Sequence, residues 1–406
     1  MSLDISNASA VLKEYYSKQR VEQLTYKDAP LYALLTKVKD FYGDSYPLPM
    51  RVTNPQGASA TFASAQANKQ ASNYKKFQLT RVKDYSLASI STEAILASSS
   101  NSGAFLQLAT AEIDGAMDTM KRRIGWALYG NGSGSLGQVN AEPAEAATTV
   151  ITMKNVDDIV RIEVGQTINI WSAESGGSQR NTDGSDNSWL VTNVDRDAGT
   201  FTLDDAYTSS GTIAANDHIF VEGDRGAKLS GLAAWIPSTA PGATPFFGVD
   251  RSTDATRLGG IRVASSGKPI DEALIDAARR VGREGLGSPD YVFCSFDKYA
   301  SLEKTLGARI RYKDVVVAKV GFKGIEVTGP QGTMTVLPDR DCPSDKMFML
   351  DMTSWALYSL KDPVQLLDQD GNKMLRESSA DAHEVRIGGY FQLGCSSPGS
   401  NAVLVF

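Results

Sequence analysis

The sequence predicts an α+β protein whose helical and strand-rich stretches are segregated along the chain. Three observations carry this prediction. One apolar stripe with helical spacing runs through Gly103–Tyr129, short alternating runs separated by polar turns fill Gly137–Lys228, and helices mix with strands after Leu232. With 406 residues, of which 42% are apolar and 22% charged, the chain is long enough for two or three globular domains.

The segment after residue 44 predicts a long two-stranded extension. Tyr46–Val52 and Phe77–Ser89 alternate between apolar and polar side chains, as strands with one buried face do. Between them, Thr53–Asn73 offers only Phe62 as a large apolar side chain. Such a segment cannot bury enough apolar area to offset its own ordering entropy. We therefore expect another surface to order it, which indicates a protein that works as an assembly.

Charge is distributed unevenly along the chain. Ser45–Lys83 has no acidic residue and sums to +6 in a chain of net charge −6, whereas Ala141–Lys228 carries 15 acidic and six basic residues and sums to −9. Two solvated faces would account for this pattern, and so would complementary surfaces that set the docking register between copies. On the second interpretation, the candidate inter-subunit contact residues are Arg51, Lys69, Lys75, Lys76, Arg81 and Lys83.

The clearest periodic element is the helix predicted over Gly103–Tyr129. Asn101 or Ser102 can cap its start, and the glycine-rich Gly130–Gly134 stops it. At 1.5 Å per residue it would be a rod of about 40 Å. Ahead of it, residues 1–44 predict an arm with short helical patterns, one of which starts at Pro30.

Two further regions follow this helix. Gly137–Lys228 predicts an all-β sandwich or barrel with a tight turn at Asp195–Gly199. After Leu232, helices are predicted over Asp271–Gly285 and from a Ser295 cap to Leu306. Strands are predicted at Asp290–Cys294, Asp314–Ala318, Gly324–Val327, Thr333–Leu337, Met347–Leu350, Ala356–Ser359, Glu384–Gln392 and Ala402–Phe406.

Motifs for catalysis, cofactors and metals are missing from the sequence. It contains no nucleophile elbow, phosphate-binding loop or zinc-protease motif. His218 and His383 are interpreted as surface or structural histidines, and the three distant cysteines as buried hydrophobic residues. The Asp183–Asn187 loop has calcium-type oxygens but lacks EF-hand spacing, which favours a solvated loop. We expect no catalytic, cofactor or metal site.

Membrane and nucleic-acid interpretations are also weak. No apolar run approaches the roughly 20 residues that span a bilayer, and the N-terminus does not resemble a signal peptide, which predicts a cytoplasmic product. Lys69–Lys83 combines cations with Tyr74 and Phe77, a combination that suits base stacking. Its strand-like alternation favours a protein partner instead.

The order of these elements resembles the major capsid proteins of tailed bacteriophages, the Hong Kong 97 fold. Ile113–Gly134 (IDGAMDTMKRRIGWALYGNGSG) resembles that family's spine helix and its glycine-rich exit, and Gly231-Leu232 resembles the GL step that follows it. Leu274–Leu302, Pro338–Asp351 and Ala382–Leu404 resemble the axial-domain helices and strands and the closing strands. Together the matches cover most of residues 45–406.

The resemblance implies a domain plan with a long spine helix, an extended β-hairpin loop, an axial α/β domain and an all-β insertion domain. Because family members usually reach the GL step soon after the spine helix, the acidic β unit is interpreted as an insertion on the outer face of the shell. The implied divisions are an N-terminal arm (1–44), the extended loop (45–97), the spine helix and start of the peripheral domain (98–136), the insertion (137–228), and the axial domain with the remaining peripheral domain (229–406).

The same resemblance implies a structural protein that is not an enzyme. Copies would form the hexamers and pentamers of an icosahedral head, assembled in the bacterial cytoplasm, and would enclose double-stranded DNA without reading its sequence. Expected partners are a portal, a decoration protein and a separate scaffolding protein, because no long charged helix precedes the arm. Some relatives crosslink an extended-loop lysine to an asparagine; Lys69, Lys75, Lys76 and Asn372 are candidates, although solvated lysines are the favoured interpretation.

Two other function classes stay open at this point. The β unit could be a surface-recognition or adhesin-type module for carbohydrate or a decoration protein. An enzyme using paired carboxylates is the third class, and it lacks identifiable cleft residues.

Overall fold

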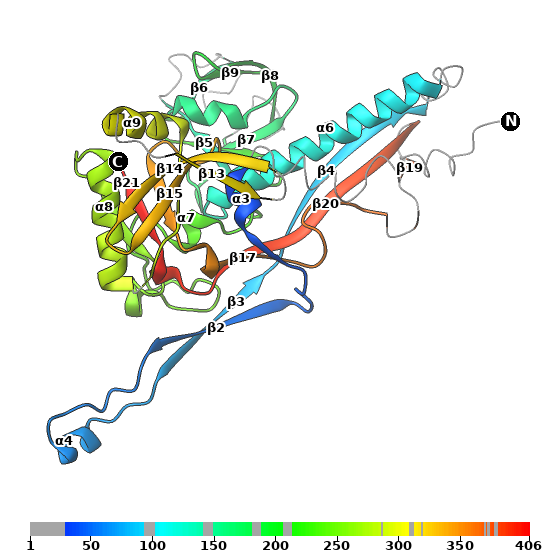
Figure 1. Ribbon diagram of the computed structural model, residues 1–406. Coiled ribbons are helices and arrows are strands. Elements are labelled where there is room, and N and C mark those ends of the chain that lie inside the picture. The colour runs from blue at the N-terminus through cyan, green and yellow to red at the C-terminus, as the bar shows by residue number, and fades with distance from the viewer. Residues whose placement is uncertain are drawn as a thin grey trace. The chain divides into compact units, whose positions relative to one another are not determined.

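The computed structural model describes residues 29–92, 102–140, 149–180, 188–205, 213–285, 287–307, 312–317, 320–368, 371, 374–376 and 381–406 (Figure 1). The chain divides into two compact units. Unit 1 comprises Met1–Gly125, Trp235–Cys342 and Lys346–Phe406, and unit 2 comprises Trp126–Ala234 and Pro343–Asp345.

A seven-stranded mixed sheet forms one half of unit 1, in the order β11-β21-β16-β12-β15-β14-β13. Helix α8 (Ile270–Arg280), which continues into the π-turn η3 (Val281–Gly285), and α9 (Phe296–Leu306) accompany it. Ser295 caps α9 by accepting a hydrogen bond from the amide of Lys298. The strands are β11 (Ile261–Ala264), β12 (Tyr291–Cys294), β13 (Tyr312–Val317), β14 (Val320–Gly329), β15 (Gly332–Pro338), β16 (Lys346–Leu350) and β21 (Ala402–Val405).

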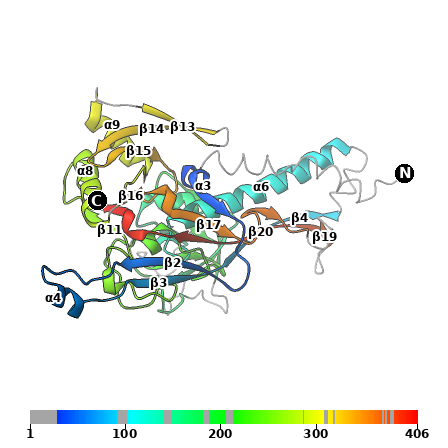
Figure 2. The same ribbon diagram turned by 60° about the horizontal axis from the view of Figure 1, so that its bottom comes forward.

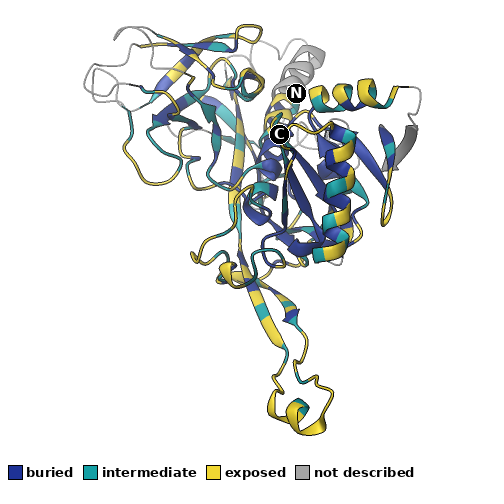
Figure 3. Ribbon diagram, turned by 90° about the vertical axis from the view of Figure 1, so that its left-hand side faces the viewer, coloured by how far each residue is buried: buried dark blue, intermediate teal, exposed yellow. Residues whose placement is uncertain are grey.

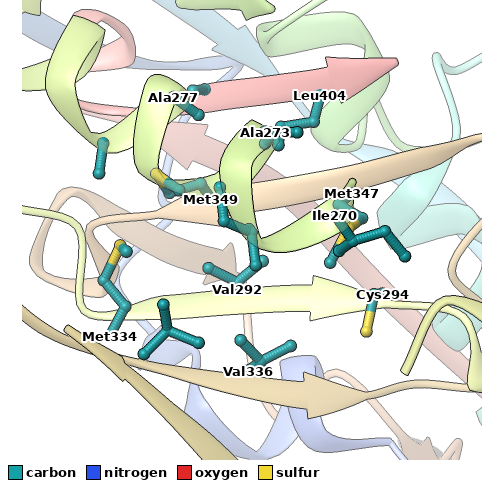
Figure 4. Close-up of a cluster of buried hydrophobic side chains, with 14 of the residues drawn as sticks. Ile270, Ala273, Ala277, Val292, Cys294, Met334, Val336, Met347, Met349 and Leu404 are labelled. Carbon is teal, nitrogen blue, oxygen red and sulfur yellow. The ribbon is translucent and has the colours of Figure 1, made fainter. Parts of the chain in front are cut away.

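The core of this half lies between α8 and the sheet (Figure 4). Ile270, Ala273 and Ala277 of α8 are buried at spacings of three and four, the pattern of one helix face. They pack with side chains such as Val292 and Met349 on the strands. Close packing of this many apolar groups is the main source of stability for the half.

A second sheet is organised around one long strand. β20 (Ala382–Cys395) pairs along one edge with β17 and with two short strands, and along the other with β4; β1 completes the sheet by pairing in parallel with β17. Its other strands are β1 (Thr36–Val38), β4 (Val82–Ser91), β17 (Trp355–Ser359), β18 (Gln365–Leu366) and β19 (Leu375–Arg376). The short helical segments of unit 1 are α3 (Pro30–Leu34), η2 (Ser252–Asp254), η5 (Met352–Ser354) and η6 (Pro398–Ser400).

Helix α6 (Ser102–Tyr129) is the longest helix described and runs along β4 (Figures 1 and 2). The pair is joined by an ion pair in which Arg123 Nε and Nη2 lie 3.0 and 2.9 Å from Asp84 Oδ1. Ile113, Met117 and Met120 are buried at helical spacing, which explains why the sequence period predicts this helix correctly.

A separate two-stranded hairpin extends from unit 1. Its strands are β2 (Ser45–Thr53) and β3 (Asn73–Thr80), and a short helix, α4 (Phe62–Ala67), lies at its tip (Figure 1). The antiparallel register runs from Ser45 opposite Thr80 to Thr53 opposite Asn73, with an irregularity near Val52. The strands confirm the predicted stem Tyr46–Val52 and the first part of the predicted stem Phe77–Ser89.

Unit 2 contains a small all-β barrel. Its six antiparallel strands pair in the order β5-β10-β7-β8-β9-β6. The path closes where Val139 bridges Met153, supported by the bond from Asn140 N to Thr152 O at 2.9 Å. The unit's elements are β5 (Ser135–Gln138), β6 (Val150–Thr152), η1 (Val156–Arg161), β7 (Thr167–Trp171), β8 (Trp189–Asp195), β9 (Thr200–Leu203), β10 (His218–Val221) and most of α7 (Leu232–Trp235).

The structure differs from expectation at two places. First, Thr53–Asn73 contains the six-residue helix α4, which the polar composition did not indicate. Second, the expected extended loop at 45–97 divides between two sheets, because β4 pairs with β20 over Val82–Ser91 and the hairpin ends at Thr80. Alternation identifies β4 as a strand but cannot identify its partner, which lies about 300 residues away in the sequence.

Candidate inter-subunit interface

The inner half of the hairpin is fixed to its own chain by apolar packing. Phe77 and Leu79 on β3 are fully buried. The ring of Phe77 packs edge-on against Trp235 at 5.0 Å between centroids. Leu48 and Leu79 lie over Gly394 of β20, where an added methyl group would stand 2.9 Å from each of them. Gly394 therefore allows the hairpin to sit close to the sheet.

Polar contacts complete this attachment. Gln78 N donates to Phe247 O at 2.9 Å, and Arg257 Nη1 donates to Val52 O at 2.6 Å. Gln392 Nε2 donates to Thr80 O at 3.0 Å. Phe247 has a φ of +46°, a conformation that an aromatic residue adopts only under constraint, so this turn is shaped to receive the strand.

A buried arginine supports the same turn. Arg251 Nη1 donates to Trp235 O at 3.1 Å, and its guanidinium lies 4.0 Å from the centre of the Phe246 ring. Burial, and to a smaller degree the charge of Arg262, lowers the pKa of Arg251 to about 10. Arg251 remains a cation at neutral pH and links the turn to the chain around Trp235.

The outer half of the hairpin is bare by contrast (Figure 3). Helix α4 has no buried residue, and Phe62 at its start is 83% exposed. The loop is closed at its neck, where Gln56 N donates to Gln70 O at 3.1 Å. A rigid base and an uncovered end are the features expected of a segment that packs on another molecule.

The structure places the six predicted contact residues in three settings. Arg51, Lys69, Lys76 and Lys83 are exposed, and Lys83 lies on β4 outside the hairpin. Lys75 is half-buried near Asp250, whose pKa is lowered mainly by hydrogen bonds from Ser252 and less by Lys75. Arg81 is held within its own chain, because its Nη1 donates to Phe41 O at 2.7 Å.

Sequence reasoning missed the residues that hold the hairpin in place. Arg257 and Gln392 lie far along the chain from the strands they bind, so no local pattern points to them. Phe62 was noticed because it is the single large apolar side chain in a polar stretch. Its position at the first turn of a helix had no sequence signal beyond that isolation.

Other kinds of site find little support in the described residues. Within them, no group of three histidine, cysteine, aspartate or glutamate side chains is arranged to hold a metal. No helix in the described part of the chain is long and apolar enough to cross a membrane. The loop Asp183–Asn187, which is interpreted as solvated and not as a calcium site, and the candidate crosslink acceptor Asn372 lie outside the described residues.

The histidines and cysteines occupy structural positions. His218 opens β10, with Nδ1 3.1 Å from Ser135 Oγ and Nε2 3.0 Å from Gln138 Nε2, and burial lowers its pKa. A hydroxyl and an amide do not orient an imidazole as the carboxylate of a catalytic triad does. His383 lies near the start of β20, and all three cysteines are buried and free, as predicted.

A hairpin that is fixed at its base and bare at its tip is typical of a subunit that packs on other copies in an assembly. A family model described as SU10 major capsid protein matches residues 18–374 of this sequence. The chain belongs to that family. It is therefore a structural major capsid protein of a tailed bacteriophage with a Hong Kong 97-like fold, and its working form is a virion shell built of many copies.

Three of the solved structures that are similar to the chain come from two phages and from Synechococcus elongatus. The capsid asymmetric unit of cyanophage A-1(L) is 15% identical, with a TM-score of 0.49, covering 93% of this chain and 92% of that chain. The holo-SrpI encapsulin complex of Synechococcus elongatus is 12% identical, with a TM-score of 0.42 and coverages of 92% and 86%. The structure from Mycobacterium phage Bobi is 10% identical, with a TM-score of 0.41, covering 100% of this chain and 99% of that chain. No curated protein sequence matches.

Proposed function

We propose that copies of this chain form the hexamers and pentamers of an icosahedral head that encloses double-stranded DNA without reading its sequence. The observation that carries this proposal is the family match over residues 18–374. Its range includes the β barrel of unit 2, and the match gives no support to the adhesin alternative. The head would assemble in the host cytoplasm with a portal, a scaffolding protein and a decoration protein, and the chain would perform no catalysis.

The parts of the chain take the roles that follow from this assignment. The hairpin Ser45–Thr80 would be the extended loop that lies over a neighbouring copy, and α6 the spine helix. The seven-stranded sheet with α8 and α9 would form the axial domain, and residues 1–44 an arm that reaches another copy. The barrel of unit 2 would be an inserted domain on the outer face of the shell.

The docking role of the hairpin is supported by charge as well as by exposure. Ser45–Lys83 carries +6 while the chain sums to −6, so the remainder of each copy carries −12. A second copy is therefore, on average, an anionic partner for this segment. Long-range attraction of this kind orients the partners and speeds their encounter more than it adds affinity.

Charge reversal on the hairpin tests this role. In Lys69→Glu/Lys76→Glu, both changes lie at exposed positions of the hairpin, so the thermal unfolding midpoint of the isolated subunit should stay within a few degrees. Shell formation is measured by electron microscopy and sedimentation. It should fail, or the protein concentration that it requires should rise by at least about tenfold. Lys361→Glu, an exposed lysine outside the hairpin, is the matched control and should assemble normally. If the double variant forms shells at the same protein concentration as the wild type, the hairpin cations have no docking role.

A further inference from the structure

The tip of the hairpin presents a single large aromatic side chain to solvent. Phe62 is the first residue of α4 and is 83% exposed, more than any other large apolar side chain of the described residues. The neck beneath it is closed by the bond from Gln56 to Gln70 and by the close approach of Gly57 to Lys69. A large exposed aromatic ring that can be buried in a pocket of a partner is typical of an interface anchor.

Unit 1 also has one strand that exposes two large apolar side chains on the same face. Tyr85 and Leu87 of β4 are 43% and 56% exposed, and they point away from the face on which Asp84 binds Arg123. The Tyr85 ring lies across Gly388 of β20, and its hydroxyl is 3.3 Å from that of Tyr390. Among the described residues, β4 pairs only with β20, so its other edge is open.

The spacing of this pair suits one aromatic ring. Residues two apart on a strand are separated by about 7 Å. A ring in contact at about 3.5–4 Å on each side needs nearly that width. The other exposed large apolar side chains of unit 1, such as Ile275 and Phe296, lie singly on different elements.

The hairpin that carries α4 and the strand β4 extend in opposite directions within unit 1 (Figures 1 and 2). In Figures 1 and 2, α4 and the outer part of β4 point away from each other on either side of the sheets. A side chain at the tip therefore cannot reach β4 of its own copy. Complementary surfaces at opposite ends of one molecule produce head-to-tail contacts, which close into rings when the rotation allows.

We propose that Phe62 of one copy packs between Tyr85 and Leu87 of a second copy. This inference rests on the proposed shell function and names the contact that anchors its extended loop. The neighbouring cations Lys69 and Lys76 orient the hairpin, and the buried ring supplies most of the affinity. The contact forms only between copies, so it leaves the folding of the isolated subunit unchanged.

Disulfide trapping between two singly substituted chains tests the contact directly. Phe62→Cys chains are mixed with Leu87→Cys chains under assembly conditions and treated in air with copper(II)–phenanthroline. Two Cu(II) ions accept the two electrons of each thiol pair, the buffer takes the two protons, and dissolved oxygen reoxidises the copper. A dimer on a non-reducing gel is expected. Phe62→Cys mixed with Phe296→Cys is the matched control, because Phe296 is as exposed as Leu87 (59% against 56%). The native cysteines do not compete, since they are buried and burial raises the pKa of Cys294 and Cys395 to about 12.

The contribution of the Phe62 ring to shell assembly is tested by comparing Phe62→Ala with Gln66→Ala, which changes an exposed polar residue on the same helix. Truncating an anchor should raise the protein concentration needed for shells by at least about tenfold, whereas the control should stay within about twofold. Both variants should unfold at the wild-type temperature. If wild-type and Phe62→Ala chains form shells equally well, or if Phe296→Cys traps as efficiently as Leu87→Cys, the anchor contact is wrong while the shell function stands. A wild-type chain that forms neither shells nor capsomers, by itself or together with a scaffolding protein, overturns both.

Discussion

Single buried charges determine how the long helix of unit 1 meets its sheet. Asp84 is 5% exposed and Arg123 17% exposed, and the arginine places two nitrogens within 3.0 Å of one carboxylate oxygen. A charge this far from water is tolerated only when an opposite charge and hydrogen bonds replace its hydration. The pair therefore fixes the register between β4 and α6 more than it adds net stability.

Removing one member of this pair should be costly. In Asp84→Asn the Arg123 cation stays partly buried without its counter-charge, so we expect the free energy of unfolding to fall by about 3 kcal/mol. Urea denaturation of the isolated subunit measures this loss. Asp362→Asn is the matched control in unit 1, because Asp362 and its ion-pair partner Lys39 are 34% and 41% exposed. That change should cost about 0.5 kcal/mol or less. An equal loss in both variants would contradict a special role for Asp84.

At the scale of elements, the helix α4 is unusual because it forms without burying any side chain. Isolated helices shorter than about 12 residues are marginal in water, and this one has six residues. Phe77 and Leu79 at the base of the same hairpin are fully buried. We therefore expect a stable inner half of the hairpin and an outer half that a partner orders.

Hydrogen exchange distinguishes these halves. In the dilute subunit, amides of Gly57–Ala71 should exchange within seconds, whereas those of Phe77 and Leu79 should be protected like the rest of the sheet. In assembled shells, protection of Gly57–Ala71 should rise by at least about a hundredfold, because the neighbouring copy then excludes water. Equal protection of this segment in the free subunit and in shells would show that no partner orders it.

Elements were predictable from the sequence where their pattern is local. The stripe through Ile113, Met117 and Met120 identifies α6, and alternation identifies the stems of the hairpin. The helix α4 escaped prediction because it has no apolar face to create a period. The contact of Arg81 within its own chain was not predictable either, because nothing in a basic stretch of sequence indicates that one of its cations donates a hydrogen bond to Phe41 O. Contacts between distant segments leave no local pattern.

At the scale of the whole molecule, the two units are built in different ways. The strands of the unit 2 barrel all come from Ser135–Val221, so each strand finds its partners nearby in the sequence. Unit 1 instead pairs segments from both ends of the chain, such as β4 with β20 and β1 with β17. A region that completes its own sheet can fold independently, which is why the barrel was predictable as a unit and the sheets of unit 1 were not.

This difference predicts that the barrel can be removed. Ser135 on β5 lies opposite Phe220 on β10, so an Asn-Gly turn that replaces Leu136–Ile219 can join them as a two-residue hairpin. Phe220→Thr is included because the deletion uncovers that buried ring. Asp224 and Lys228, whose charged groups are 3.2 Å apart, are kept.

The shortened chain should stay soluble and unfold cooperatively within about 5 °C of the full chain's unit 1 transition, measured by circular dichroism and calorimetry. Aggregation, or a broad transition with strong dye binding to exposed apolar surface, would show that unit 1 depends on the barrel for its fold.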